Sequence, residues 1–129
     1  MKKKIFQKLI DKAYELRPMV NHGRNIHFTF LVRNSRIITV GWNNPNKTHP
    51  FPAKVGYEYP YIHSEYACLK IASVMTRANF SRCFLVNIRI DKTGKINLSK
   101  PCKNCRNLIC FFGVTKVYYS NSLGEFDES

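Results

Sequence analysis

The sequence predicts a three-layer α/β/α domain, in which a mixed sheet of about five strands carries helices on both faces. Two observations favour this fold class. The chain has 129 residues and 44% hydrophobic content, enough for one buried core and too little for two, so residues 1–129 are expected to form a single domain. Strand-length runs rich in β-branched and aromatic residues alternate with helix-length apolar segments. The expected order is helix, two strands, helix, strand, helix, strand, with a short strand at the end.

The N-terminal segment predicts an amphipathic helix. Apolar residues recur at helical spacing between Ile5 and Leu16, and Pro18 is expected to end the pattern. The polar face is basic, and we expect the apolar face to pack on the sheet. No apolar stretch approaches the ~20 residues that span a bilayer, and no apolar segment of a secretory signal follows Met1-Lys-Lys-Lys4. We therefore expect no membrane partner.

A hairpin and a long loop follow this helix. His27–Arg33 and Arg36–Gly41 read as strands, and the short polar Asn34-Ser35 joins them. Residues 42–61 then hold four prolines and five aromatic residues. A stretch of this kind inside a compact domain predicts a functional loop.

The second half predicts two buried helices and the strands around them. Ile62–Ala78 is apolar on nearly all sides and indicates a buried helix, and Cys83–Ile90 reads as a core strand. Asp91–Gly94 predicts a turn, and Lys95–Leu98 the returning arm of a hairpin. Cys102–Phe112 predicts the second buried helix.

Proline and glycine mark the ends of that second helix. Pro101 stands where proline is tolerated at a helix start, and Gly113 favours a helix end. Lys116–Ser120 then reads as a strand. The five residues after Gly124 predict a short edge strand.

The chain is strongly basic. It holds 21 Lys and Arg against 8 Asp and Glu, and three of the acidic residues fall in the last five positions. Residues 1–124 therefore combine 21 basic with five acidic residues, a net charge of +16. Such a charge favours polyanionic partners and speeds their encounter with the protein. Lysine outnumbers arginine 13 to 8, so compositional drift with a gain in solubility stays open as the alternative.

His63, Cys102 and Cys105 are the candidate metal ligands. One imidazole and two thiolates form a set that suits zinc, and cysteines three residues apart can grip one ion from the first turn of a helix. Glu65 is the wrong residue for a fourth ligand in such a set and the right one to move protons of a water molecule. Three protein ligands indicate a catalytic zinc, whereas a fourth would make the site structural; the candidates for that fourth ligand are Cys68 and His49. With two of five cysteines committed to a metal, a reduced, cytoplasmic setting fits best.

With Pro101 in front of the cysteine pair, the pattern is H-x-E followed by P-C-x-x-C, and over about residues 25–120 the chain resembles the zinc-dependent cytidine deaminase superfamily. The resemblance implies the α/β/α fold, a Zn²⁺ cofactor held by His63, Cys102 and Cys105, and hydrolytic deamination. It implies that Glu65 takes a proton from the attacking water, passes it to the ring nitrogen and helps ammonia leave. The two motifs by themselves fit cytosine and adenine alike.

The resemblance also suggests three substrate-binding residues. Gly41-Trp-Asn43 is similar to the family's G-x-N segment, whose Asn binds the sugar or base; an Asn that caps a turn is the alternative. Ser64 stands where the family more often has Ala, and its backbone N–H would bind a base oxygen. Tyr119 ends the fourth strand, where polynucleotide-acting relatives keep an aromatic residue; the alternative is that Tyr118 and Tyr119 are one core and one surface ring.

The last strand is expected to run antiparallel to Lys116–Ser120, because no helix fits between them. In the deoxycytidylate, tRNA-adenosine and APOBEC-type branches a helix stands there and makes the last strand parallel. The expected arrangement resembles instead the branch that holds free-cytidine deaminases, bacterial toxin deaminases and plant organelle RNA editors. His63 in place of a first-ligand Cys points away from the free-cytidine enzymes.

Three functions fit these features. The first is deamination of cytosine to uracil in single-stranded nucleic acid, favoured by the basic excess and by aromatic residues that could stack on bases. The second is the same reaction on a free cytosine nucleotide or nucleoside, such as dCMP or cytidine. The third is a non-catalytic zinc module that binds nucleic acid. Glu65 argues against this third function, because a structural zinc site has no use for that carboxylate.

Overall fold

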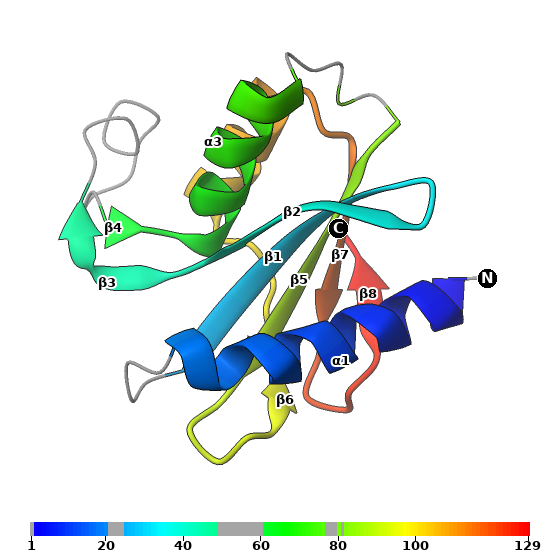
Figure 1. Ribbon diagram of the computed structural model, residues 1–129, viewed down its shortest axis with the longest axis vertical. Helices are drawn as coiled ribbons and strands as arrows, with labels where there is room; N and C mark the ends of the chain where they lie inside the picture. Colours follow the sequence, from blue (N-terminus) through cyan, green and yellow to red (C-terminus); the bar gives the residue numbers. More distant parts are fainter. Residues whose placement is uncertain (1, 21–24, 49–60, 77–79, 81) are drawn as a thin grey trace.

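The computed structural model describes residues 2–20, 25–48, 61–76, 80 and 82–129 (Figure 1). In chain order the elements are α1 (Lys2–Val20), β1 (Ile26–Arg33), β2 (Arg36–Trp42), β3 (Asn44–Thr48), β4 (Tyr61–Ile62), α3 (Ser64–Thr76), β5 (Phe84–Ile90), β6 (Ile96–Asn97), α4 (Lys103–Phe111), β7 (Lys116–Ser120) and β8 (Phe126–Glu128). The predicted order of helices and strands is confirmed. Two short strands, β3 and β4, are additional to it.

The main sheet is mixed, as the sequence predicted. Its strand order is β2-β1-β5-β7-β8, and β6 pairs with β5 as the returning arm of a hairpin. β1 runs antiparallel to both β2 and β5, whereas β5 and β7 are parallel, which the intervening α4 allows. β8 returns antiparallel to β7, which confirms the predicted direction of the last strand.

Helices cover both faces of this sheet, which confirms the three-layer fold class (Figure 1). α1 lies on one face, where Ile5, Leu9 and Ala13 pack against alternate residues of β1 and β5 such as Phe28 and Ile88. α3 and α4 lie on the other face, in a second cluster of buried residues; this cluster includes Leu31, Leu69, Leu85, Ile109 and Val117. Because side chains alternate along a strand, neighbours such as Phe30 and Leu31 serve opposite layers.

The structure corrects the predicted end of the N-terminal helix. α1 continues through Pro18 to Val20 instead of closing before the proline. A proline in a helix lacks the N–H that would bond to the carbonyl four residues earlier. Pro18 lies in the last turn, so its missing N–H affects only the helix end. Within the described residues, no helix is long and apolar enough to cross a bilayer.

β3 and β4 form a small second sheet in the region where the sequence predicted a loop. They pair antiparallel at Asn44↔Ile62 and Thr48↔Tyr61. Neither segment alternates apolar and polar residues, so the period of a strand is absent from the sequence. Ile62 belongs to β4, and α3 consequently begins at Ser64, two residues later than predicted. This pairing holds the start of α3 beside the end of β2. The rest of the predicted loop, residues 49–60, lies outside the described residues.

Candidate metal centre

The candidate ligands lie at the starts of two helices. His63 directly precedes α3, and Cys102 is the N-cap residue of α4. Cys102 has an extended backbone (φ −67°, ψ 166°), and its Sγ accepts a hydrogen bond from the backbone N–H of Cys105 at 3.4 Å. A cap of this type satisfies one of the free N–H groups at a helix start. It also turns the Cys102 sulfur back over the first turn, toward Cys105.

His63, Cys102 and Cys105 come together as the sequence predicted. Their candidate ligand atoms all lie within 4.8 Å of one another, and this is the one such group within the described part of the chain. Cys105 Sγ lies 3.4 Å from His63 Nδ1. Cys105 is buried, His63 is half-buried and Cys102 is exposed. The group is therefore anchored on the buried side by Cys105 and open to solvent on the side of Cys102.

The electrostatics of the group suit a metal. Hydrogen bonding to Cys105 and to His63 outweighs partial burial and lowers the pKa of the Cys102 thiol to about 4. The bond to Cys102 raises the pKa of His63 above its usual value. The group thus presents Cys102 as a thiolate at neutral pH, the form of cysteine that binds a metal ion. Two sulfurs and one nitrogen are a donor set that fits Zn²⁺, with a coordination position left for a non-protein ligand.

Glu65 lies in the first turn of α3 and is not a member of the ligand group. Its side chain is only 6% exposed. Oε1 accepts a hydrogen bond from the Ser64 hydroxyl at 3.1 Å, and Oε2 accepts one from Nδ2 of Asn87 at 3.0 Å. A buried carboxylate is costly unless hydrogen bonds satisfy it, and here both oxygens have partners. Glu65 is held beside the ligands as a fixed acceptor.

Two residues of this surrounding were missed from the sequence, Thr29 and Asn87. Thr29 lies in the middle of β1 and Asn87 in the middle of β5, and both are almost completely buried. Thr29 Oγ1 lies 2.7 Å from Asn87 Oδ1 and 2.8 Å from Ser64 Oγ. A signal was present, because each is an uncharged polar residue between two apolar neighbours in a strand. Buried polar groups at such positions need partners, and here the partners are one another and Glu65.

The three predicted substrate-binding residues have different surroundings. The Asn43 side chain accepts from the backbone N–H of His27 at 3.0 Å and donates to the carbonyl of Asn25 at 3.4 Å, so it ties the end of β2 to the start of β1. Ser64 is buried, and its hydroxyl contacts Glu65. Tyr119 is half-buried and lies in register with Asn87 on the neighbouring strand. Substrate roles for all three stay predictions.

Of the two alternative fourth ligands, the structure describes Cys68, which is not a member of the group. Cys68 is fully buried in the core, and its sulfur lies 3.1 Å from the hydroxyl of Thr39. Burial raises the pKa of Cys68 to about 12, so it stays a neutral thiol. His49 lies outside the described residues. None of the five cysteines, all of which the structure describes, is in a disulfide, and Cys110 is exposed on α4.

A family model matches almost the whole chain. The model describes the zinc-binding region of cytidine and deoxycytidylate deaminases, and it matches residues 3–121. The match includes every residue of the H-x-E and P-C-x-x-C motifs. No match was found among curated proteins.

Solved structures with the same fold come from a phage of cyanobacteria. The chain is similar to dCMP deaminase from the cyanophage S-TIM5 in apo form, with a TM-score of 0.60 and 22% identity; the alignment covers 94% of this chain and 86% of that one. It is also similar to the same enzyme in complex with dCMP and dUMP, with a TM-score of 0.59 and 21% identity over 94% and 84% of the two chains. At this identity the likeness shows the fold.

Proposed function

The chain belongs to the cytidine and deoxycytidylate deaminase family, a family of zinc-dependent enzymes, and from this premise we propose that it converts the cytosine of a free nucleotide to uracil. We include in the proposal that residues 1–129 act as one deaminase domain. The single observation that carries it is the placement of Glu65, a buried and doubly hydrogen-bonded carboxylate beside three ligand atoms that it does not join. A site that only fixes structure has no use for such a group.

His63, Cys102 and Cys105 would hold the zinc. The chemistry that zinc supplies in such a site is acidification of the attacking water, to a pKa of about 7. Glu65 takes the proton from this water, passes it to the ring nitrogen beside the attacked carbon, and then helps the amino group to leave as ammonia. One water is consumed and one ammonia released for each cytosine converted to uracil.

The choice of a free nucleotide draws support from the solved relatives, whereas the antiparallel β8 is the arrangement of the other branch of the superfamily and favours the second candidate below. The phage enzyme of the same fold is named a dCMP deaminase, and one of its structures holds dCMP and dUMP. Asn43 and the backbone N–H of Ser64 are the groups proposed to bind the sugar or base. We place the chain in a reducing cytoplasm, with which five cysteines that form no disulfide are consistent.

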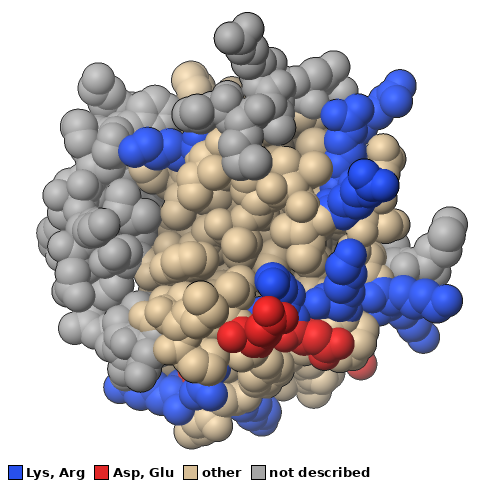
Figure 2. Space-filling model, in the orientation of Figure 1, with Lys and Arg blue, Asp and Glu red and all other residues tan. Residues whose placement is uncertain are grey.

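Single-stranded nucleic acid is the second candidate substrate, and the charge of the chain favours it. The +16 over residues 1–124 would attract a polyanion. Basic side chains on the face shown in Figure 2 gather over α1 and near the turn between β1 and β2. α1, however, covers the face of the sheet opposite to α3 and α4, so much of this charge lies away from the ligand group. For a polymer substrate, Tyr119 is the proposed stacking residue, and Tyr119→Ala should weaken binding by roughly 1–3 kcal/mol.

The deciding experiment offers zinc-loaded protein four substrates side by side: dCMP, cytidine, single-stranded DNA and single-stranded RNA. Mass spectrometry follows the gain of about one mass unit that replaces an amino group by oxygen. Product from dCMP and none from either polymer supports the free-nucleotide function. Product from a polymer alone would replace it by the second candidate, and absence of product from all four would overturn deamination of cytosine.

A further inference from the structure

The carboxylate of Glu65 belongs to a closed ring of four side chains. The other three, Thr29, Ser64 and Asn87, are not in the expected catalytic set. Glu65 Oε1 contacts Ser64 Oγ at 3.1 Å, Ser64 Oγ contacts Thr29 Oγ1 at 2.8 Å, Thr29 Oγ1 contacts Asn87 Oδ1 at 2.7 Å, and Asn87 Nδ2 contacts Glu65 Oε2 at 3.0 Å. All four side chains are buried, with exposed fractions of 6% or less. The ring joins β1, β5 and the first turn of α3.

The orientation of Asn87 fixes the direction of the ring. Its Nδ2 faces two acceptors, Glu65 Oε2 at 3.0 Å and the carbonyl oxygen of Ser99 at 3.3 Å, so the amide hydrogens must point that way. Oδ1 is then an acceptor that faces Thr29. The Ser99 hydroxyl also donates to the backbone carbonyl of Asn87 at 2.8 Å, which holds this part of β5 in place. Asn87 therefore draws the hydroxyl hydrogen of Thr29 toward itself.

The two hydroxyls of the ring have defined donor roles. Ser64 Oγ donates to Glu65 Oε1. Thr29 Oγ1 is the donor toward both Ser64 Oγ and Asn87 Oδ1, and its one hydrogen can serve one of these acceptors at a time. Both carboxylate oxygens of Glu65 therefore receive a hydrogen bond, one from Ser64 and one from Asn87.

We propose that Thr29, Ser64 and Asn87 are positioning residues for Glu65: Ser64 and Asn87 each bind one oxygen of its carboxylate, and Thr29 holds Ser64 and Asn87 in place. This inference rests on the proposed role of Glu65 in proton transfer. The ring holds the carboxylate in place before the reaction begins. Such preorganisation costs no rearrangement at the moment of reaction.

The test removes one hydroxyl of the ring without changing the size of the side chain. Thr29→Val should lower kcat for deamination by about 10–100-fold, the usual effect of losing a partner that orients a reacting group. KM and zinc content should stay at wild-type values, because the Thr29 hydroxyl contacts Ser64 and Asn87 and Thr29 is not in the ligand group. Thr29→Ser keeps the hydroxyl and should restore kcat. Ser64→Ala opens the ring at its second hydroxyl and should lower kcat in the same way, which keeps the test valid if valine at 29 prevents folding.

Thr39→Val is the matched control. Thr39 is also a buried threonine of the main sheet, and its hydroxyl donates to the carbonyl of Cys68 at 3.1 Å, away from Glu65. It should lose stability like Thr29→Val and keep its kcat. If the wild-type enzyme is active and Thr29→Val and Ser64→Ala have the same kcat as Thr39→Val, the positioning role of the ring is contradicted. The proposed function is not affected by that result. A wild-type chain that is inactive on dCMP, cytidine and oligonucleotides would overturn the proposed function, and the ring's catalytic role with it.

Discussion

The carbonyl oxygen of Ser64 lies so close to Gly41 that a Cβ built on this glycine would stand 2.6 Å from it. The same Cβ would meet the backbone of Ala67 and Cys68, and real Cβ atoms do not approach backbone atoms within 3.0 Å. Gly41 in β2 therefore sets how closely the sheet approaches the first turn of α3. His63 precedes that turn and Glu65 lies in it, so the geometry of the site depends on a residue that has no side chain.

Gly41→Ala should lower the free energy of unfolding by at least about 3 kcal/mol, because only backbone shifts can relieve the overlap. The variant should also bind less zinc, since α3 must move away from α4. Gly124→Ala is the control, at a position with φ of +77° and nothing within 4 Å of the new Cβ. Its loss should be limited to the strain of a left-handed backbone, about 1–2 kcal/mol. Urea unfolding and metal analysis check both variants, and equal losses would contradict this role of Gly41.

Alanine in place of His63, Cys102 or Cys105 should each remove most of the zinc, which wild-type protein should hold at about one ion per chain. The physical reason is that a site with three protein ligands has none to spare. Cys110→Ala is the matched control, because Cys110 is a free, exposed cysteine on the same helix. It should keep its zinc. Retention of zinc after loss of any one of the three ligands would show that another residue completes the site.

Glu65→Gln should keep zinc and thermal stability and lower kcat by at least about 10²–10⁴-fold, because an amide cannot accept the proton. The amide has the same shape and can still accept from Asn87 and donate to Ser64, so the fold is preserved. Glu15→Gln makes the same change on α1, where Glu15 only pairs with Lys12 at 3.2 Å, and should be neutral. Near-normal turnover of Glu65→Gln would show that another group moves the proton.

The sequence predicted those parts of the fold whose signals are local. The helices and the strands of the main sheet follow periods of 3.6 and 2, and the ligand types and the spacing of Cys102 and Cys105 predicted the metal group. The last strand, β8, was predicted to be antiparallel because too few residues separate it from β7 to form a helix, and the structure confirms this direction. Pro18 was misjudged because a proline in a last turn costs one hydrogen bond and does not stop the helix.

The ring around Glu65 could not be predicted from local patterns in the sequence. Thr29 and Ser64 are 35 positions apart in the chain, and Thr29 and Asn87 are 58 apart. Each residue is consistent with its own strand or helix, and only the pairing of β1 with β5, in which Thr29 and Asn87 are direct partners, brings them together. Register of this kind depends on the packing of the whole sheet. The sequence could mark Thr29 and Asn87 as unusual, but not as partners of Glu65.

Asp91 should give the hairpin of β5 and β6 a stability that depends on pH. Its carboxylate accepts from the Thr93 hydroxyl at 2.6 Å and from the N–H groups of Thr93 and Lys95 at 2.9 and 3.0 Å. These bonds, that of the Thr93 hydroxyl first, lower the pKa of Asp91 from 3.8 to about 2. Since the pKa falls on folding, the contribution is complete above about pH 4 and is lost as the pH falls toward about 2.

Melting temperatures of wild type and Asp91→Asn between pH 2 and pH 6 check this dependence. The variant should melt lower than wild type at pH 6, and the difference should shrink as the pH falls through the window between 3.8 and about 2. A difference that stays constant over the whole range would contradict the assigned cause.

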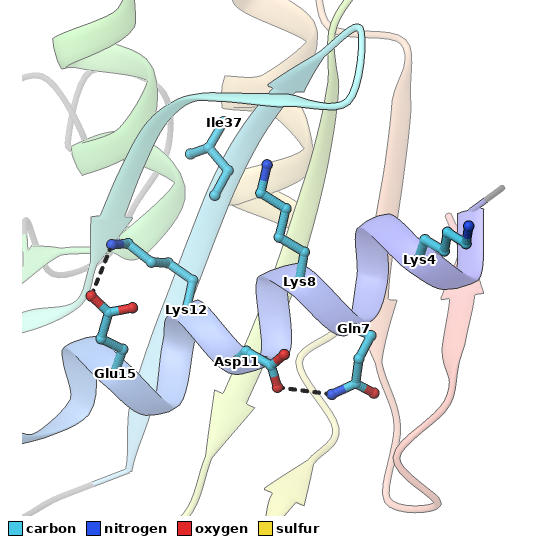
Figure 3. Close-up of a pocket in the computed structure, with 7 residues that line it drawn as sticks. All are labelled: Lys4, Gln7, Lys8, Asp11, Lys12, Glu15 and Ile37. Atoms are coloured by element: carbon cyan, nitrogen blue, oxygen red, sulfur yellow. Dashed lines mark hydrogen bonds and ion pairs between the residues drawn. The ribbon is translucent and has the colours of Figure 1, made fainter.

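Substitution of the lysines of α1 tests whether their positive charge contributes to catalysis. Lys4 and Lys8 line a groove of about 510 Å³ between α1 and Ile37 of β2 (Figure 3). Lys4 is exposed, and Lys8 reaches the carbonyl of Ser35 at 3.5 Å. The sheet lies between this groove and the metal group. Lys4→Gln with Lys8→Gln should therefore leave kcat/KM for dCMP unchanged.

The matched pair is Lys100→Gln with Lys103→Gln, two exposed lysines that flank Cys102. Binding of a single-stranded oligonucleotide should weaken with salt, with a log–log slope of about −0.7 for each phosphate contacted. Lys100 and Lys103 are the exposed lysines beside Cys102, so if a bound strand contacts both with its phosphates, removal of this pair should make the slope shallower by about 1.4. Removal of Lys4 and Lys8 should leave the slope unchanged. If the α1 pair carries the salt dependence instead, the basic charge of α1 binds polyanions at a place separate from the active site.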